Sequence, residues 1–93
     1  MALLGSKQHT VGDTKRWTVN YDKWLTNTAT IDQIDVTSDS LTCTVGNVQI
    51  LGHEIVFFLS GGELNERLNV GLIMTDDLGN IKHDTIAFTV IAA

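Results

Sequence analysis

Leu68-Asn69-Val70-Gly71-Leu72-Ile73-Met74 is the stretch that decides the fold of this 93-residue chain. Leucine, valine, leucine and methionine recur at every second position, and side chains two residues apart lie on one face of a β-strand. The same period of two appears at residues 17–21, 41–45 and 86–90, where threonines fill several alternate positions. Threonine suits a half-exposed pleated surface. No segment keeps a period of 3.6 residues, so the sequence predicts an all-β fold.

The segment Ile55-Val56-Phe57-Phe58-Leu59 differs from these stretches because it is apolar on both faces. We expect it to be the most buried strand, with Ile55, Phe57 and Leu59 facing one way and the other two side chains facing the opposite way. A strand of this kind needs cover on its outer face. That cover would come from a second layer, from the N-terminal segment or from a partner.

Glycine, asparagine and aspartate separate the apolar runs and mark turns. Strands are predicted near residues 15–21, 31–37, 41–45, 48–51, 54–60, 67–75 and 82–91. A short helical turn is predicted at residues 22–26. About six or seven short strands at this spacing predict an immunoglobulin-like antiparallel β-sandwich.

The chain length fits one domain, which we place at residues 14–93 and which follows an N-terminal arm at residues 1–13. The arm mixes Leu3, Leu4 and Val11 with polar residues. Chain termini are usually disordered unless something holds them. We therefore expect the arm to dock on its own domain or on a neighbour, and we take its three apolar residues as candidate partner-binding residues.

Composition excludes several classes of function. The net charge is −5 and the only adjacent basic pair is Lys15-Arg16, which argues against a nucleic-acid partner. No run of about 18 apolar residues is present, so no membrane span is expected. The apolar stretch at residues 1–6 is too short for a secretory signal. Cys43 is the single cysteine, so no internal disulfide forms, and its place in an alternating stretch predicts a small buried apolar side chain.

No group of residues predicts catalysis, a metal site or a cofactor. The histidines lack the spacing of metal ligands, and the acidic loop lacks the ligand order of a calcium site, so solvated carboxylates are the preferred interpretation over a minor calcium alternative. No serine lies on a nucleophile elbow, and no two carboxylates form a matched acid and base. The residues considered and set aside are His9, His53, His83, Asp32, Asp35, Asp39, Ser60, Glu54, Glu63 and Glu66.

The aromatic residues Trp17, Tyr21 and Trp24 form one cluster in the sequence. The cluster is either a platform for a sugar or a partner, or an anchor of the core, because aromatic side chains dominate core burial. Trp17 is expected to make a surface contact and is the fourth candidate partner-binding residue. The full predicted core is Val19, Tyr21, Trp24, Ile31, Ile34, Val36, Val45, Ile55, Phe57, Leu59, Val70, Met74, Ile86, Phe88 and Val90.

The order of several short motifs resembles a known group of proteins. Asp22-Lys23-Trp24-Leu25 is followed by Thr30-Ile31, then by Phe57-Phe58-Leu59-Ser60-Gly61-Gly62, an alternating strand, a glycine-containing hairpin and a last apolar strand. Over residues 15–91 this order is similar to the small immunoglobulin-like virion proteins of tailed bacteriophages and prophages. The shared Trp-Leu pair at residues 24–25 implies a core position for Trp24.

The resemblance implies a non-enzymatic structural protein of a phage particle, made in the host cytoplasm and present in many copies in the virion. Its partners would be other virion proteins, namely major capsid, neck or tail proteins. We expect decoration or reinforcement of the head, with a neck or tail component as the alternative. A carbohydrate-binding or adhesion module is a competing hypothesis, which exposed aromatics beside Asn and Asp would support. An accessory domain of an enzyme is a third.

Overall fold

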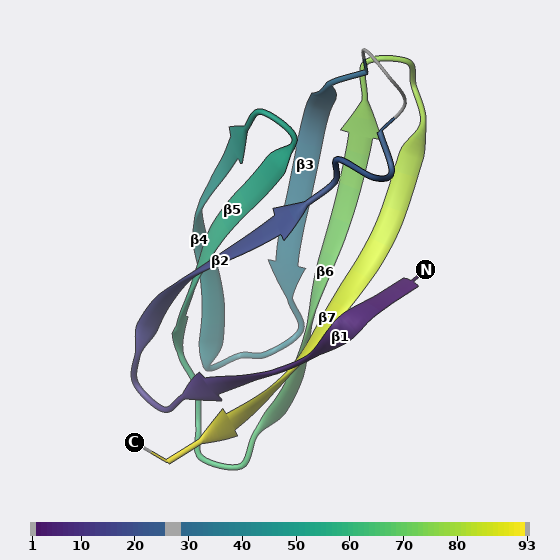
Figure 1. Cartoon of the computed structure of the whole chain (residues 1–93). Coiled ribbons are helices and arrows are strands. Elements are labelled where there is room, and N and C mark those ends of the chain that lie inside the picture. The colour runs from purple at the N-terminus through teal and green to yellow at the C-terminus, as the bar shows by residue number, and fades with distance from the viewer. Residues whose placement is uncertain (1, 26–28, 93) are drawn as a thin grey trace.

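The computed structural model describes residues 2–25 and 29–92, with the backbone alone at residues 2–4. Seven strands and no helix occur in these residues (Figure 1). The strands are β1 (Ala2–Thr10), β2 (Thr14–Asn20), β3 (Ile31–Ser38), β4 (Cys43–Leu51), β5 (Glu54–Gly61), β6 (Arg67–Asp76) and β7 (Ile81–Ile91).

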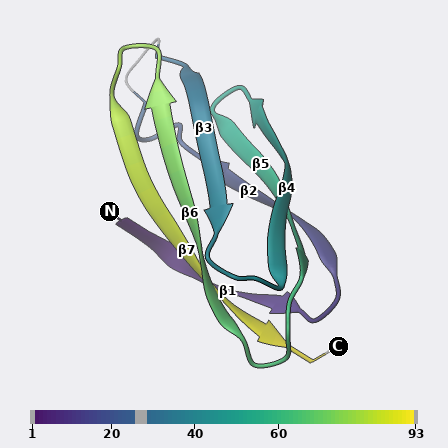
Figure 2. The same ribbon diagram turned by 180° about the vertical axis from the view of Figure 1, so that it is seen from behind.

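The strands form two sheets that face each other (Figures 1 and 2). The four-stranded sheet has the order β1-β7-β6-β3, and the three-stranded sheet has the order β2-β5-β4. Neighbouring strands are antiparallel except for β1 and β7, which are parallel. The prediction of an all-β fold with about seven strands is confirmed.

The expected N-terminal arm contains a strand of the four-stranded sheet. β1 runs along the free edge of β7, with a register shift between Leu3 and Gly5. His9 lies opposite Val90 and is fully buried. The place of β1 in the sheet therefore depends on its backbone pairing with β7. The weak apolar pattern of residues 2–10 does not reveal this pairing.

The two strands predicted at residues 41–45 and 48–51 are one strand, β4. Its pairing with β5 is irregular between Gly46 and Gln49, and Asn47 there has a φ of 49°. The glycine and asparagine that suggested a turn therefore mark a β-bulge, which inserts residues without ending the strand. The strand begins at Cys43, so Leu41 lies in the preceding loop and not on the sheet.

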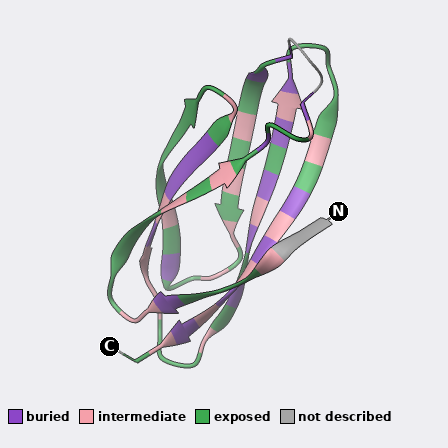
Figure 3. Cartoon of the chain, viewed as in Figure 1, coloured by how far each residue is buried: buried purple, intermediate pink, exposed green. Residues whose placement is uncertain are grey.

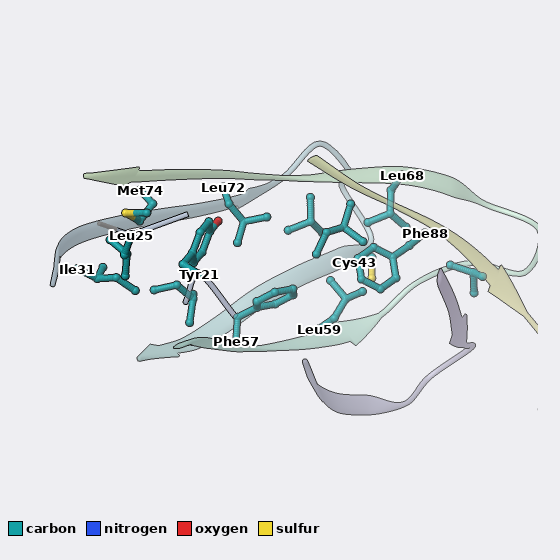
Figure 4. Packing of buried hydrophobic residues seen from close by; sticks show 14 of the residues in the cluster. Tyr21, Leu25, Ile31, Cys43, Phe57, Leu59, Leu68, Leu72, Met74 and Phe88 are labelled. Atoms are coloured by element: carbon teal, nitrogen blue, oxygen red, sulfur yellow. The ribbon is translucent and has the colours of Figure 1, made fainter. Parts of the chain in front are cut away.

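The core fills the space between the sheets, where Phe57, Leu72 and Phe88 meet (Figure 4). Along β6 and β7 buried residues alternate with more exposed ones (Figure 3), as the period of two predicted. The predicted core residues that are buried are Tyr21, Ile31, Ile55, Phe57, Leu59, Val70, Met74, Ile86, Phe88 and Val90. Those half-buried against this cluster are Val19, Trp24, Ile34, Val36 and Val45. Core residues missing from the prediction are Leu25, Ala29, Leu68 and Leu72, whereas Cys43 is buried as expected.

The outer face of β5 carries Val56, which is buried, and Phe58, which is half-buried. The pairing register places Thr18 and Gln49 beside Val56, while Phe58 has Gly46 on one side. The two-sheet arrangement provides no third layer over this face within the described residues. The described residues thus show no second layer over this face, and cover of the face by a partner stays a prediction.

A single hydrogen-bonded turn follows β2, where the helical turn was predicted. The amides of Trp24 and Leu25 donate to the Tyr21 carbonyl at 3.0 and 2.9 Å. This turn carries Leu25 into the core beside Tyr21 (Figure 4).

Candidate partner-binding surface

Two of the candidate partner-binding residues from the sequence, Val11 and Trp17, have described side chains, and both are half-buried against the core. Trp17 pairs with Phe57 across β2 and β5 and therefore points inward. Its ring packs edge-on against Phe88 with centroids 5.0 Å apart, and Lys15 Nζ lies 4.7 Å from its centroid. Trp17 thus lies half-buried at the margin of the core, and its contact with a partner stays a prediction.

The other three candidates belong to the N-terminal segment. Val11 is half-buried against the core, and its amide donates to the Ile91 carbonyl at 2.9 Å. Leu3 and Leu4 lie in β1, and their side chains fall outside the described part of the structure.

Three loops meet at one end of the sandwich, at the bottom of Figure 1. They are the β1–β2 turn (residues 11–13), the β3–β4 loop (residues 39–42) and the β5–β6 loop (residues 62–66), and we call this the loop end. Backbone hydrogen bonds join them, because Gly61 donates to the Asp13 carbonyl at 3.1 Å and Gly62 donates to the Thr42 carbonyl at 3.0 Å.

Two exposed leucines distinguish the loop end. Leu41, in the β3–β4 loop, is 100% exposed, and Leu64, in the β5–β6 loop, is 54% exposed. A single exposed leucine is ordinary on a protein surface. Leu41 differs from an ordinary exposed leucine because hydrogen bonds hold the loop around it in one conformation.

The carboxylate of Glu66 ties the β3–β4 loop to the β5–β6 loop. Oε1 accepts hydrogen bonds from Thr42 Oγ1 at 2.7 Å and from the Glu63 amide at 3.1 Å, while Oε2 accepts one from Ser40 Oγ. The hydrogen bonds from Ser40, Thr42 and Glu63 lower the pKa of Glu66, since they favour its ionised form. Ser40 and Thr42 are the two residues that flank Leu41.

Further hydrogen bonds, within the β3–β4 loop and from this loop to β6, fix its conformation. Ser40 Oγ accepts the amides of Thr42 and Cys43 at 3.1 and 3.0 Å. Asp39 Oδ1 accepts the amide of Asn69 on β6 at 2.8 Å. The backbone on both sides of Leu41 is therefore anchored while its side chain contacts solvent.

Gly61 allows the two loops to approach this closely. Its φ is +87°, and a Cβ atom at this position would lie 2.6 Å from the Thr42 carbonyl oxygen. A residue with a side chain would need both a rare backbone conformation and a shift of the β3–β4 loop. The positive φ is the conformation that the sequence predicts for a glycine at the end of a strand.

The opposite end of the sandwich carries the β6–β7 hairpin. Leu78 and Ile81 there are 67% and 59% exposed. Asp76 Oδ1 accepts the amides of Leu78 and Asn80 at 3.0 and 2.8 Å. Burial opposes ionisation of Asp76, but hydrogen bonds from Asn80, Leu78 and Gly79 outweigh it and lower the pKa. Both ends thus present apolar side chains on loops held by a carboxylate.

The described residues bring no three His, Cys, Asp or Glu side chains together as a metal site. A shallow hollow of about 300 Å³ opens between β3 and β4, lined by residues that include Val36 and Val45. Within residues 2–25 and 29–92, no helix is long and apolar enough to span a membrane.

Comparison with known proteins assigns the family. A family model described as "Podophage GP4 fiber-tail adaptor protein gp77" matches residues 9–89, which is most of the chain. Comparison with curated proteins gives no match. The family's description names fibre and tail, so the expected decoration of the head is not supported and the tail alternative fits better. The chain therefore belongs to the podophage GP4 fiber-tail adaptor protein gp77 family and is a structural protein of the phage virion.

Proposed function

We propose that this chain is a non-enzymatic adaptor that joins a fibre to the tail of a podophage particle. The family match over residues 9–89 is the observation that carries this proposal, since it spans β2 to β6 in full and parts of β1 and β7. Its partners are a tail protein and a fibre protein of the same particle. Several copies bind around the tail, and multivalent attachment turns modest contacts into firm ones.

The scaffold of this adaptor is an immunoglobulin-like sandwich. In immunoglobulin constant domains, strands C, F and G form one sheet and strands B, E and D lie in the other. If the seven strands are lettered in chain order, β3, β6 and β7 correspond to C, F and G, and β2, β5 and β4 correspond to B, E and D. Six of the seven strands follow this order and support the immunoglobulin-like assignment, whereas β1, lettered A, pairs with β7 and not with β2.

Attachment takes place through the loop end, with Leu41 as its central contact. Burial of a leucine side chain in a partner contributes about 1.5–3 kcal/mol. Binding also costs free energy when a mobile loop becomes ordered, and a loop that is already anchored avoids much of that cost. Leu41 and Leu64 are therefore suited to enter an apolar pocket on one partner.

An adaptor needs a second, separate surface for its other partner. The molecule measures 42 Å along its longest axis and about half of that across. The hairpin end, with Leu78 and Ile81, lies at the far end of the elongated sandwich from the loop end (Figure 1). We assign the second contact to this end.

The test uses the phage that encodes this chain, with the gene replaced by Leu41→Asp or by Leu78→Asp. Purified particles are analysed for adaptor and fibre content by quantitative mass spectrometry. We expect wild-type particles to contain both proteins and each variant to lose at least one of them by about ten-fold or more, because a lost leucine contact of ~1.4 kcal/mol changes affinity ten-fold.

The outcomes separate the parts of the proposal. Wild-type particles that lack the chain, or that keep it after the tail is removed, would contradict the adaptor function. Leu41→Asp particles with normal adaptor and fibre content would exclude the loop end as an attachment surface. Immunogold labelling of the wild-type chain gives its position on the particle independently of either variant.

Exposed aromatic side chains beside Asn and Asp would support the carbohydrate-binding alternative. Tyr21 is buried, and Trp17 and Trp24 are half-buried against the core. The feature that would have supported this alternative is thus missing from the aromatic cluster. Binding of the purified chain to a glycan array would revive the hypothesis.

A further inference from the structure

We infer that Glu66 is the positioning residue for Leu41, and that its carboxylate is an acid-sensitive latch on the β3–β4 loop. The importance of Leu41 for a partner rests on the proposed function. The latch itself rests only on contacts within the chain, so the two can be tested separately.

The latch acts on both sides of Leu41. Glu66 holds Ser40 through one carboxylate oxygen and Thr42 through the other. A carboxylate has two oxygens with lone pairs in one plane and can therefore fix two donors at once. Leu41 lies between these two anchored residues, so its Cα position depends on Glu66 although its side chain makes no contact with it.

The hydroxyl of Ser40 extends the effect into the backbone of the loop. A serine hydroxyl has one proton to donate and two lone pairs that accept. Since the proton goes to Glu66, the lone pairs are oriented toward the amides of Thr42 and Cys43. Loss of the carboxylate frees the hydroxyl to rotate and weakens these two hydrogen bonds as well.

The ionisation of Glu66 controls the latch, because none of the charged groups around it forms a described ion pair with its carboxylate. Asp39, at the start of the β3–β4 loop, is bonded to Asn69, and Glu63 contributes its backbone amide. On β4 the Cys43 thiol is neutral, because burial and then the charge of Glu66 raise its pKa. Arg67 is the next residue, but the described ion pairs do not include one between it and Glu66. The latch therefore consists of neutral donors around one carboxylate.

The sign of the pH dependence follows from these contacts. Donors that bind the ionised form lower the pKa of Glu66 below its ordinary value of about 4.3. The contribution of these hydrogen bonds to the stability of the folded chain is fully present above that ordinary value. It is lost as the pH falls through the lower pKa that Glu66 has in the folded state. The loop is therefore latched at neutral pH and released in acid.

Nuclear magnetic resonance relaxation of the purified chain tests the latch directly. Backbone order parameters are measured for residues 39–42 at about pH 7 and about pH 3, on either side of the glutamate range. In the wild type we expect about 0.85 at neutral pH and below about 0.6 in acid, the values of rigid and flexible backbone. Glu66→Ala should give the low value at both pH values.

Glu63→Ala is the matched control, because it removes a carboxylate from the same loop but keeps the amide that donates to Glu66. It should behave like the wild type. Order parameters of Val70 and Leu72 on β6 report whether the core remains folded. A rigid loop in folded Glu66→Ala at neutral pH, or an acid transition that persists in this variant, would overturn the inference.

Particle content then links the latch to attachment. Glu66→Ala should reduce adaptor or fibre content in the same direction as Leu41→Asp but by a smaller factor. If relaxation shows a released loop while the particles are normal, the latch stands and the role of Leu41 in attachment fails.

Discussion

Lys82 Nζ lies 3.0 Å from Asp84 Oδ1 inside the sandwich, on neighbouring inward positions of β7. Asp84 is 1% exposed, and neither of its oxygens accepts a hydrogen bond of good geometry among the described residues. Burial and then the charge of Asp84 raise the pKa of the nearby Tyr21 phenol far above its ordinary range. Lys82 is thus the main compensation for a buried negative charge.

Lys82→Met should lower the free energy of unfolding by about 3 kcal/mol, because removal of one partner leaves the other charge buried without compensation. Urea denaturation measures the loss. Lys23→Met, at an exposed position, should change the stability by less than about 0.5 kcal/mol. Equal effects of the two substitutions would show that the ion pair does not offset the burial of Asp84.

Gly61→Ala should destabilise the chain more than Gly79→Ala. Both glycines have a φ of +87°, but a Cβ at position 61 meets the Thr42 carbonyl oxygen at 2.6 Å, whereas nothing lies within 4 Å at position 79. Gly79→Ala should cost about 1 kcal/mol for the backbone conformation, and Gly61→Ala should add about 1–3 kcal/mol for the clash. Thermal unfolding of the two variants measures the difference. Similar costs would mean that the β3–β4 loop moves freely away from Gly61.

Phe57→Ala and Phe58→Ala should differ strongly, although the residues are adjacent. Phe57 is fully buried between the sheets, and its removal should cost about 3–5 kcal/mol. Phe58 is half-buried on the outer face, so its removal should cost about 1 kcal/mol. Guanidinium unfolding curves check the order. A reversed order would show that β5 presents its faces the other way round.

The Cys43 thiol should resist alkylation in the folded chain. It is fully buried, and burial followed by the charge of Glu66 raises its pKa, so little thiolate forms at about pH 8. Mass spectrometry should find no iodoacetamide adduct under native conditions and complete labelling in denaturant. Rapid labelling of the native chain would mean that β4 opens easily beside the β3–β4 loop.

Alternating apolar residues predicted the strands of the core well because packing between two layers selects every second side chain. β6 and β7 follow this rule along most of their length. β1 could not be predicted in the same way, because its place depends on backbone pairing with β7 and not on a regular apolar face. At Leu41 the alternation begins two residues before the strand, which starts only at Cys43.

The sequence contains the residues of the loop end but does not show which of them are in contact. Glu66 had been considered as an acid or base and set aside, and Ser40 is 26 residues away from it in the chain. No local pattern joins residues at such a distance, because the contact exists only after β3 and β6 pair. Neither the exposure of Leu41 nor its relation to the carboxylate can be read from the sequence, where Leu41 continues an alternating apolar pattern.

The position of β7 has a consequence for how the protein is made. β7 lies between β1 and β6, and among the seven strands it is the last to leave the ribosome. Until then β1 has no partner in its sheet, and one edge of β6 stays open. The nascent chain must therefore carry unpaired edges through most of its synthesis, and non-local pairing of this kind slows folding. The four-stranded sheet is therefore complete only after the final strand has joined it.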